Sequence, residues 1–358
     1  MVYGGGSIKR AGIYDEAMKL LTGAGLTVFV LPGVEPNPRI ESVRKGAELC
    51  KAEGIDMVLA IGGGSTIDCA KVIAGAAKND GDAWDLVLNS NLIQSALPIY
   101  TVLTLSATGS EMDGIAVISD LTKNEKWATA SALFKPKMAI LDPEYTYSVS
   151  KKQTSAGTAD MISHILENYF TNVTGADVQA SFCEGLLKTA FKYGPVAMEN
   201  PTDYDARANL MWTASFAING LLSAGADVKW CVHPMEHELS AFYDCAHGAG
   251  LAVVMPAWME YVMSHDVMRF ARFAVEIFGC EMDFANPERT AREGIARFKE
   301  FLRSIDMPVT FAEVGGKAED IPAMVAHRAE KPGGFPFGGF IKIGPEEMEA
   351  ILRLTARA

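Results

Sequence analysis

The sequence lacks long apolar runs, paired cysteines and clusters of basic residues. No apolar run approaches about 18 residues without a charge or a break, so we expect no membrane span. The six cysteines are scattered without a CxxC pair, and no apolar signal core follows the N-terminus, which predicts a reduced, cytoplasmic protein. The formal charge of -12, without any run of Lys or Arg, argues against a nucleic-acid partner.

The first part of the chain alternates between strand-like and helix-like segments. We expect strands at 26–31, 57–61 and 99–102, helices at 40–53 and 66–77, and a hairpin formed by 115–119 and 126–129. This βαβ rhythm predicts a mostly parallel sheet with helices on both faces. The first glycine run, at residues 4–6, follows only three residues, whereas a strand averages about five or six. We therefore expect a first strand that is short, or a chain that lacks its beginning.

The strand pattern ends after Asp142-Pro143, and the rest of the sequence is helical. Apolar residues recur at intervals of three and four in 151–170, 176–192, 203–222, 247–262, 267–278 and 287–302. There is no internal repeat and no low-complexity linker. The sequence thus predicts an α/β domain over residues 1–146 followed by an all-α domain over residues 147–358.

Four of the six histidines and one aspartate form a pattern that a single metal ion would explain. Asp160 and His164 are one helical turn apart, and His233 and His237 repeat that spacing. His247 follows after a short turn. Because histidine is the commonest metal ligand, this grouping favours a metal site. For the first pair alone, a helix charge beside a buried histidine stays an alternative.

Three glycine-bearing segments in the first half are candidates for nucleotide binding. Gly62-Gly63-Gly64-Ser65 follows a buried strand and opens a helix, where backbone N–H groups and the helix dipole can hold a pyrophosphate. Residues 104–111 follow another strand and carry hydroxyls that suit a phosphate, a ribose or a helix cap. Residues 4–7 form the third segment. Neither GxGxxG nor GxxxxGK[ST] is present, so tight turns without a ligand stay an alternative.

Four motifs in register resemble the iron-containing (group III) alcohol dehydrogenases, especially their NADP-linked butanol dehydrogenase and aldehyde reductase branch. The motifs are Gly62-Gly-Gly-Ser-Thr-Ile-Asp68-Cys-Ala-Lys71, Thr104-Leu-Ser-Ala-Thr-Gly-Ser-Glu-Met112, Asp160-x3-His164 and His233-x13-His247. The match runs from Gly4 to at least Met255. The resemblance implies a Rossmann-like dinucleotide-binding domain followed by a metal-binding helical domain, with the active site in the cleft between them.

The resemblance also implies roles for individual residues. One divalent metal, Fe(II) or Zn(II), would be held by Asp160, His164, His233 and His247. The residues along the cofactor would be Gly5, Gly6, Ser7, Gly63, Gly64, Ser65, Asp68, Thr104, Thr108, Asp113 and Lys126. His237 would lie beside the substrate without binding the metal, and Asp68 near the nicotinamide. Both are therefore candidates for catalytic residues.

The segment after the first strand bears on the choice of cofactor. Relatives that prefer NAD carry an aspartate there, which binds the 2′-hydroxyl of the ribose and repels a 2′-phosphate. This sequence has Gly4-Gly5-Gly6-Ser7 instead, with Lys9 nearby. We therefore expect NADP(H) to be preferred over NAD(H).

The predicted function is that of a metal-dependent, NADP(H)-linked oxidoreductase that interconverts small primary alcohols and aldehydes. Three neutral imidazoles and one carboxylate leave a divalent metal positively charged, so it can act as a Lewis acid on the substrate oxygen during hydride transfer. We expect His237 to relay a proton between solvent and that oxygen. We also expect a homodimer, because members of the family are commonly dimers.

Other interpretations of the same residues stay open. His233-Pro-Met-Glu236-His237 satisfies the HxxEH pattern of inverted zinc peptidases, although Pro234 would interrupt the helix unless it lies in the first turn. A glycerol-dehydrogenase-like polyol oxidoreductase or a non-catalytic nucleotide-binding protein could use the same fold. Glu236 could orient a histidine or face solvent.

Several side chains near the motifs have a plain structural interpretation as well. Lys71 and Lys126 would usually be solvated, as lysines on a helix or a hairpin are. Four large apolar residues could line a substrate pocket or simply build a helical core: Phe242, Met255, Trp258 and Phe337.

Overall fold

The computed structural model describes residues 1–331 and 333–357. The chain forms two compact units. The first consists of Met1–Thr154 and Asn200–Asn219, and the second of Ser155–Glu199 and the residues from Gly220 onward. Each unit has its own core, and the two are described in turn.

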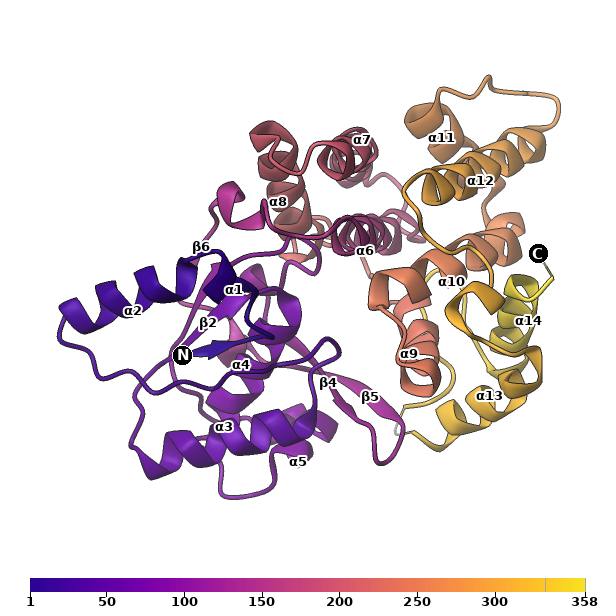
Figure 1. The fold of residues 1–358 in the computed structure, drawn as a ribbon. Coiled ribbons are helices and arrows are strands. Elements are labelled where there is room, and N and C mark those ends of the chain that lie inside the picture. The colour runs from indigo at the N-terminus through magenta and orange to yellow at the C-terminus, as the bar shows by residue number, and fades with distance from the viewer. Residues whose placement is uncertain (332, 358) are drawn as a thin grey trace. The chain divides into compact units, whose positions relative to one another are not determined.

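A four-stranded parallel sheet, in the order β1-β2-β3-β6, forms the centre of the first unit (Figure 1). Its strands are β1 (Val2–Tyr3), β2 (Val58–Gly62), β3 (Ile99–Leu103) and β6 (Met138–Ile140). Strand β2 is buried along nearly its whole length, as expected for a central strand of a parallel sheet. The predicted hairpin is present as a separate antiparallel pair, β4 (Ile115–Asp120) and β5 (Glu125–Ala130).

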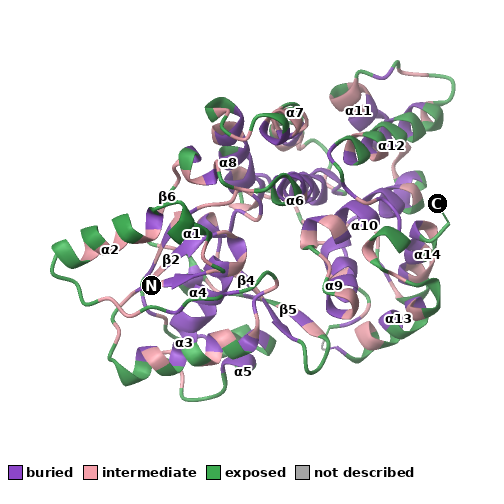
Figure 2. Ribbon diagram, viewed as in Figure 1, coloured by how far each residue is buried: buried purple, intermediate pink, exposed green. Residues whose placement is uncertain are grey.

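The described part of the first unit contains six α-helices, one of which is almost fully buried between two others and the strands. They are α1 (Ser7–Arg10), α2 (Ile13–Gly23), α3 (Ile40–Ala52), α4 (Gly64–Ala76), α5 (Ala83–Leu88) and α8 (Tyr204–Ile218). Helix α4 lies between α3, α5 and the strands, and every residue of it except Ser65 is buried (Figure 2). Helix α3 packs closely on α4 at Gly46, where a Cβ atom would collide with Ile73. This contact holds the C-terminal part of α4 against α3.

Most of the strands and helices predicted for the first half are confirmed, but one strand is wrong. Residues 26–31 do not form a strand, and Leu26 and Val30 are 42% and 38% exposed. Only Leu31 makes a β-bridge, to Val2. The reason is that β1, the neighbour available for pairing, is only two residues long. The run is apolar and extended, but it has little backbone to pair with.

The described part of the second unit consists of helices and loops, with no strand. Its helices are α6 (Lys151–Tyr169), α7 (Asp177–Glu199), α9 (Val232–Tyr243), α10 (His247–Val262), α11 (Val267–Phe278), α12 (Pro287–Ser304), α13 (Ile321–Glu330) and α14 (Pro345–Thr355). The bounds of α10 and α11 are those predicted from periodicity. Helix α8 belongs to the first unit, although its sequence continues the helical pattern. No helix among the described residues is long and apolar enough to cross a membrane.

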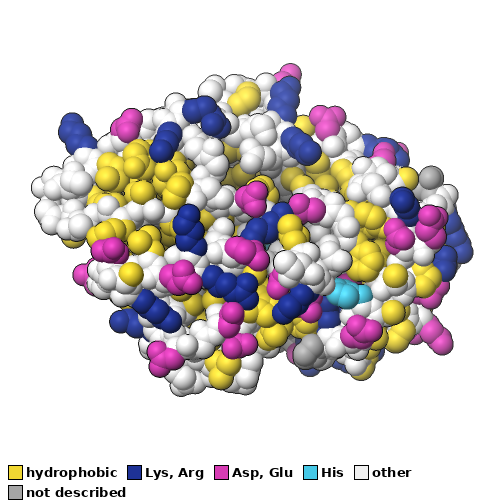
Figure 3. Space-filling view, turned by 60° about the horizontal axis from the view of Figure 1, so that its bottom comes forward, with side chains coloured by type: hydrophobic (Ala, Val, Ile, Leu, Met, Phe, Trp, Pro, Cys, Tyr) yellow, Lys and Arg dark blue, Asp and Glu magenta, His cyan; other side chains and the backbone are white. Residues whose placement is uncertain are grey.

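The core of the second unit is apolar and rich in aromatic rings. Met255 and Trp258 on α10 are each 1% exposed. The Trp258 ring contacts the rings of Phe170 and Phe340 edge-on or tilted, as aromatic pairs prefer. Met255 and Trp258 therefore belong to the helical core, which is one of the two roles that the sequence left open for them. On the face drawn in Figure 3, Lys and Arg side chains are interleaved with Asp and Glu.

Candidate functional site

Helix α6 carries three ionisable side chains on one face, at positions 160, 164 and 167. This spacing of four and seven residues places them one above another. The helix is buried along most of its length (Figure 2), and Asp160 and His164 are only 3% and 4% exposed. His164 Nε2 lies 3.3 Å from Asp160 Oδ1. A buried helix can carry such polar groups only if they are paired or bind an ion.

Two further helices bring histidines to the same place. His233 is the second residue of α9, and Pro234 follows it in the first turn, where a missing N–H group is tolerated. His247 is the first residue of α10, and its Nε2 lies 3.8 Å from Asp160 Oδ1. One ligand atom each from Asp160, His233 and His247 lie within 4.8 Å of one another. The His164 ring stacks on that of His233, with centroids 4.9 Å apart.

The close approach of α10 to α6 depends on Gly248. A Cβ atom at this position would collide with the backbone carbonyl of Ala156 on α6. The turn between α9 and α10 includes Asp244 in the left-handed conformation, with φ of 47°, which aspartate tolerates better than most residues. The backbone at these two positions therefore delivers His247 to the face of α6 that bears Asp160.

The chemistry of these side chains fits a divalent cation. Burial, followed by the nearby His233, holds the pKa of His164 well below its ordinary value, so its imidazole is neutral. Its Nδ1 is buried and has no hydrogen-bond partner among the described residues, while Nε2 points to a carboxylate oxygen. Three imidazoles and one carboxylate form a donor set that suits Zn(II) or Fe(II). The residues at this place therefore fit the metal that the sequence predicts.

A buried glutamate, Glu167, stands behind His233. Its carboxylate accepts hydrogen bonds from the backbone N–H groups of Cys231, Val232 and His233, at 2.8, 2.7 and 3.1 Å. Oε1 also lies 3.1 Å from His233 Nδ1. Burial raises the pKa of Glu167 to about 7, and the three N–H groups oppose that rise. Glu167 is not among the site residues predicted from the sequence, although its position seven residues after Asp160 places it on the same face of α6.

A second buried glutamate, Glu236, stands behind His247. It is 0% exposed, so it does not face solvent. Its two carboxylate oxygens contact His247 Nδ1 and the Ser240 hydroxyl. Of the two roles that the sequence left open for Glu236, this contact supports the orientation of a histidine.

His237 lies on α9 between these groups. Its ring centroid is 5.8 Å from that of His247, and it is only partly buried. Glu236, His237 and His247 also offer ligand atoms within 4.8 Å of one another, in an alternative grouping that shares His247 with the first. The predicted proton relay thus lies beside the predicted metal ligands.

The three glycine segments meet at the carboxyl ends of neighbouring parallel strands in the first unit. Gly62 ends β2, and its carbonyl accepts a hydrogen bond from Thr104 N, just after β3, at 3.0 Å. A Cβ atom at Gly64 would collide with the Thr108 side chain. Gly4, after β1, lies close enough that its Cβ would be 3.7 Å from Thr66 Oγ1. Ligands of open α/β sheets bind at this edge.

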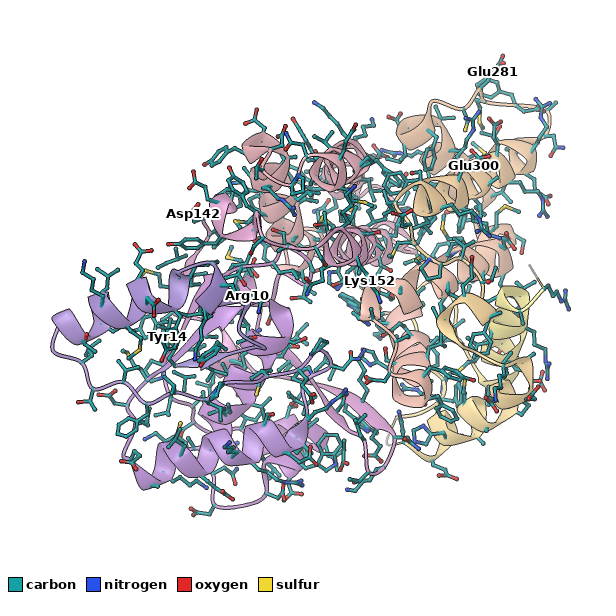
Figure 4. All side chains as sticks on the ribbon, in the orientation of Figure 1. Arg10, Tyr14, Asp142, Lys152, Glu281 and Glu300 are labelled. Atoms are coloured by element: carbon teal, nitrogen blue, oxygen red, sulfur yellow. The ribbon has the colours of Figure 1, made fainter. Side chains whose placement is uncertain are left out.

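The start of α4 and the first glycine run have conformations that suit a phosphate-binding loop. Gly63 is the N-cap of α4 and makes no side-chain cap hydrogen bond. Gly6 has φ of 100°, in the region that favours glycine. Lys9 Nζ lies 4.7 Å from the ring centre of Tyr14, which Figure 4 labels on α2. The ammonium group is therefore held over an aromatic ring close to the glycine run.

A buried ionic network joins α4 to the segment that follows β3. Lys71 is 0% exposed, and its Nζ donates to Ser110 Oγ, Asp113 Oδ1 and the Ile115 carbonyl at 2.8, 2.6 and 2.7 Å. Lys126, on β5, is 5% exposed. The alternative that these two lysines are solvated, as lysines on a helix or a hairpin usually are, is therefore excluded. The ammonium of Lys71 is buried because a carboxylate, a hydroxyl and a carbonyl receive all three of its protons.

Asp68 belongs to the same network. Its Oδ1 accepts a hydrogen bond from Ser110 Oγ at 2.6 Å, and its Oδ2 accepts one from Val117 N at 2.9 Å. Burial raises the pKa of Asp68 to about 6, while Lys71 opposes that rise. Burial raises the pKa of Asp113 as well. Both aspartates that the resemblance assigns to the cofactor therefore join α4 to residues 110–117.

The chain is similar to iron-containing alcohol dehydrogenases over nearly its whole length. Residues 1–143 match the family described as iron-containing alcohol dehydrogenase, and residues 154–356 match the C-terminal part of the Fe-containing alcohol dehydrogenase family. NADH-dependent butanol dehydrogenase A of Clostridium acetobutylicum is 50% identical, with 99% of this chain and 90% of that protein covered. The NADPH-dependent aldehyde reductase YqhD of Escherichia coli is 35% identical, with 91% and 84% covered.

Solved structures agree with these matches. The crystal structure of NADH-dependent butanol dehydrogenase A from Thermotoga maritima superimposes with a TM-score of 0.95 at 41% identity. The superposition covers 99% of this chain and 90% of that one. The predicted fold class, an α/β N-terminal part with a parallel sheet followed by helices, is confirmed.

Replacing Lys71 with methionine should destabilise the protein by about 3–5 kcal/mol, because two buried carboxylates lose their cation. Asp68 has a folded-state pKa raised above its unfolded value, so its contribution to stability is lost as pH rises through about 6. Without Lys71 that pKa rises further, and the loss should be larger at pH 8 than at pH 5. The free energy of unfolding in urea, measured at pH 5 and at pH 8 for the wild type and the variant, gives the two losses. The control Lys188→Met, at an ion pair with Glu276 in which both side chains are exposed, should change stability by less than about 1 kcal/mol. Equal losses at the two pH values would contradict the account.

Gly248→Ala should separate α10 from α6 and weaken metal binding. The added methyl meets a backbone carbonyl, which cannot rotate away, so we expect a cost at or above the about 1–3 kcal/mol typical of overpacking. The matched control is Gly185→Ala on α7, where nothing lies within 4 Å of the added atom. Metal content after gel filtration and the thermal unfolding temperature are the measurements. Full metal content in the Gly248 variant would show that the approach is not needed.

Proposed function

The chain belongs to the iron-containing alcohol dehydrogenase family, and on this premise we propose that it interconverts primary alcohols and aldehydes by hydride transfer. The family and the relatives support an alcohol or aldehyde oxidoreductase with a nicotinamide cofactor and a divalent metal, and the family description names iron. The finer assignments concern the metal ligands, the proton relay and the form of the nicotinamide cofactor.

The proposed metal ligands are Asp160, His164, His233 and His247. The observation that carries this proposal is the meeting of ligand atoms of Asp160, His233 and His247 within 4.8 Å on a buried helix face. His164 adjoins this group through its Nε2, which lies 3.3 Å from Asp160 Oδ1. A divalent cation bound there supplies Lewis-acid polarisation of an alcohol or carbonyl oxygen. The three imidazoles stay neutral, and Asp160 supplies the single negative charge among the four ligands.

His237 is the proposed proton relay. It lies one turn after His233, contacts the ring of His247 and is partly exposed, so it can exchange a proton with solvent at a ring nitrogen. Asp160, His164 and His233 are more deeply buried than His237. His247 already contacts Asp160 and Glu236. His237 is therefore the imidazole best suited to this role.

The glycine loop at the start of α4 is the proposed pyrophosphate site. Backbone N–H groups at the start of this 13-residue helix and its dipole favour an anion there. We propose NADP(H) as the preferred cofactor, because residues 4–7 include no carboxylate and Lys9 lies just beyond them. Relatives are named for either cofactor, NADH for the butanol dehydrogenases and NADPH for the aldehyde reductase.

The peptidase interpretation receives no support. Pro234 does lie in the first turn of α9, so the helix that the HxxEH pattern needs is intact. Glu236, however, would have to act as general base on a water molecule, and it is fully buried against His247 and Ser240. The relatives are oxidoreductases. A polyol stays an alternative substrate, and a homodimer, a cytoplasmic location and an active site in an interdomain cleft stay predictions.

Two variants separate the metal ligands from the proton relay. Asp160→Ala should lose its metal and its aldehyde reduction together, and Fe(II) or Zn(II) should not restore activity. His237→Ala should keep its metal, lose about 100- to 10,000-fold in rate and show an altered pH–rate profile, because a general acid–base group is gone. Metal analysis and NADPH oxidation with small aldehydes and polyol-derived carbonyls measure both. An unchanged pH profile in the His237 variant would refute the relay.

The choice of cofactor can be tested at Gly5. A Cβ atom there meets nothing within 4 Å, so Gly5→Asp adds a carboxylate without a steric clash. We expect kcat/KM for NADPH to fall at least about tenfold relative to NADH, because the carboxylate repels the 2′-phosphate. Gly5→Asn, of the same shape without the charge, is the control. If both variants change the ratio equally, charge at this position does not select the cofactor.

A further inference from the structure

Two glutamates, Glu167 and Glu236, occupy equivalent positions behind two of the proposed metal ligands. Each is buried, at 4% and 0% exposure, and each contacts the Nδ1 atom of one histidine. When the Nδ1–H group of an imidazole donates a hydrogen bond to a carboxylate, the Nε2 atom on the opposite side of the ring presents its lone pair to a metal. For His247 that opposite atom is the one that lies 3.8 Å from Asp160.

Glu167 fixes the backbone and the ring of His233 together. Its two oxygens accept the N–H groups of residues 231, 232 and 233, which are the groups left unsatisfied at the start of α9. The N-cap residue of this helix, Cys231, makes no side-chain cap hydrogen bond of its own. Helix α6 therefore supplies the cap of α9 and orients the ring with the same carboxylate.

Glu236 is held in place by the Ser240 hydroxyl and fits beside Gly250, which has no side chain. Ser240, one turn further along α9, contacts one oxygen while His247 contacts the other. On α10, a Cβ atom at Gly250 would lie 2.8 Å from Glu236 Cγ and Oε1. The absence of a side chain at Gly250 therefore leaves room for the carboxylate between the two helices.

The buried negative charges around the site destabilise its metal-free form and favour the binding of a cation. Asp160, Glu167 and Glu236 are three buried carboxylates near three imidazoles. The positive end of the α9 dipole offsets part of the charge on Glu167. A divalent cation offsets the rest. His164 differs from the other two histidines, since its Nδ1 has no hydrogen-bond partner among the described residues.

We infer that Glu167 and Glu236 are positioning residues that set the affinity of the metal site, by fixing the rings of His233 and His247 and by adding negative charge behind them. This inference rests on the ligand set proposed above. Outer carboxylates of this kind are worth about 10- to 100-fold in metal affinity.

The test compares Glu236→Leu, Glu236→Gln and Glu167→Gln with the control Glu238→Gln. Glu238 is a fully buried carboxylate on the same helix, but its partners are Lys331 and His327, away from the ligands. Zn(II) affinity is measured by competition with a chromophoric chelator, the ligand field by the absorption of the Co(II)-loaded protein, and stability by unfolding temperature with and without Zn(II).

We expect Glu236→Leu to lower Zn(II) affinity about 10- to 100-fold and to shift the Co(II) bands. Glu167→Gln keeps one oxygen that can accept from His233 Nδ1, so we expect it to cause a smaller loss of affinity. Glu236→Gln can still accept from His247 Nδ1, so it should fall between wild type and Glu236→Leu. Both Glu236 variants should shrink the rise in unfolding temperature that Zn(II) causes. Glu238→Gln should lower both unfolding temperatures equally and leave the affinity unchanged. If Glu167→Gln does not fold, the Glu236 pair carries the test.

An additional variant separates this inference from the proposed ligand set. If Asp160→Ala binds Zn(II) like the wild type, the ligand set itself is wrong. If Asp160→Ala loses the metal while both Glu236 variants bind it like the wild type, only the positioning inference is overturned. An equal loss of affinity in Glu238→Gln would also overturn it, because a general effect of removing a buried charge on α9 would then explain the result.

Discussion

The proposed metal centre depends on one constraint: helix α6 is buried along most of its length and yet carries a carboxylate and an imidazole into the core. A charge in such a place costs several kcal/mol unless a partner or an ion compensates it. Here Asp160 lies within reach of histidines from α9 and α10, and the neutral His164 stands one turn away. Two further contacts place those histidines beside Asp160. Glu167 caps the start of α9, and the absence of a side chain at Gly248 lets α10 approach α6.

The first unit solves a similar problem without a metal. Helix α4 is also almost fully buried, and Lys71 at its centre donates to Ser110, Asp113 and the Ile115 carbonyl. The resulting network ties the glycine loop at the start of α4 to the segment after β3. Preorganised loops pay less entropy on binding a ligand. If the glycine loop binds the nucleotide as proposed, we expect the buried lysine to support that binding by holding the loop in place.

Much of this could be predicted from the sequence, because periodicity and local spacing are local properties. The bounds of α10 and α11 follow from apolar recurrence, and Asp160, His164, His233 and His247 stand out by spacing and by their resemblance to a family. The features that could not be predicted from the sequence depend on tertiary contacts. The burial of Lys71 could not be predicted, because no local pattern reveals three acceptors that lie about 40 residues further along the chain. Residues 26–31 have the composition of a strand but only a two-residue neighbour. Glu167 was missed because capping another helix leaves no mark in its own sequence.

The central claim is that one divalent metal is bound by Asp160, His164, His233 and His247, and that His237 is not a ligand. A crystal structure of the metal-loaded protein, with anomalous diffraction measured at the absorption edge of the bound metal, tests it most directly. The account predicts one anomalous peak per chain, bonded to those four side chains. A peak bonded instead to Glu236, His237 and His247, which also lie within 4.8 Å of one another, would contradict it.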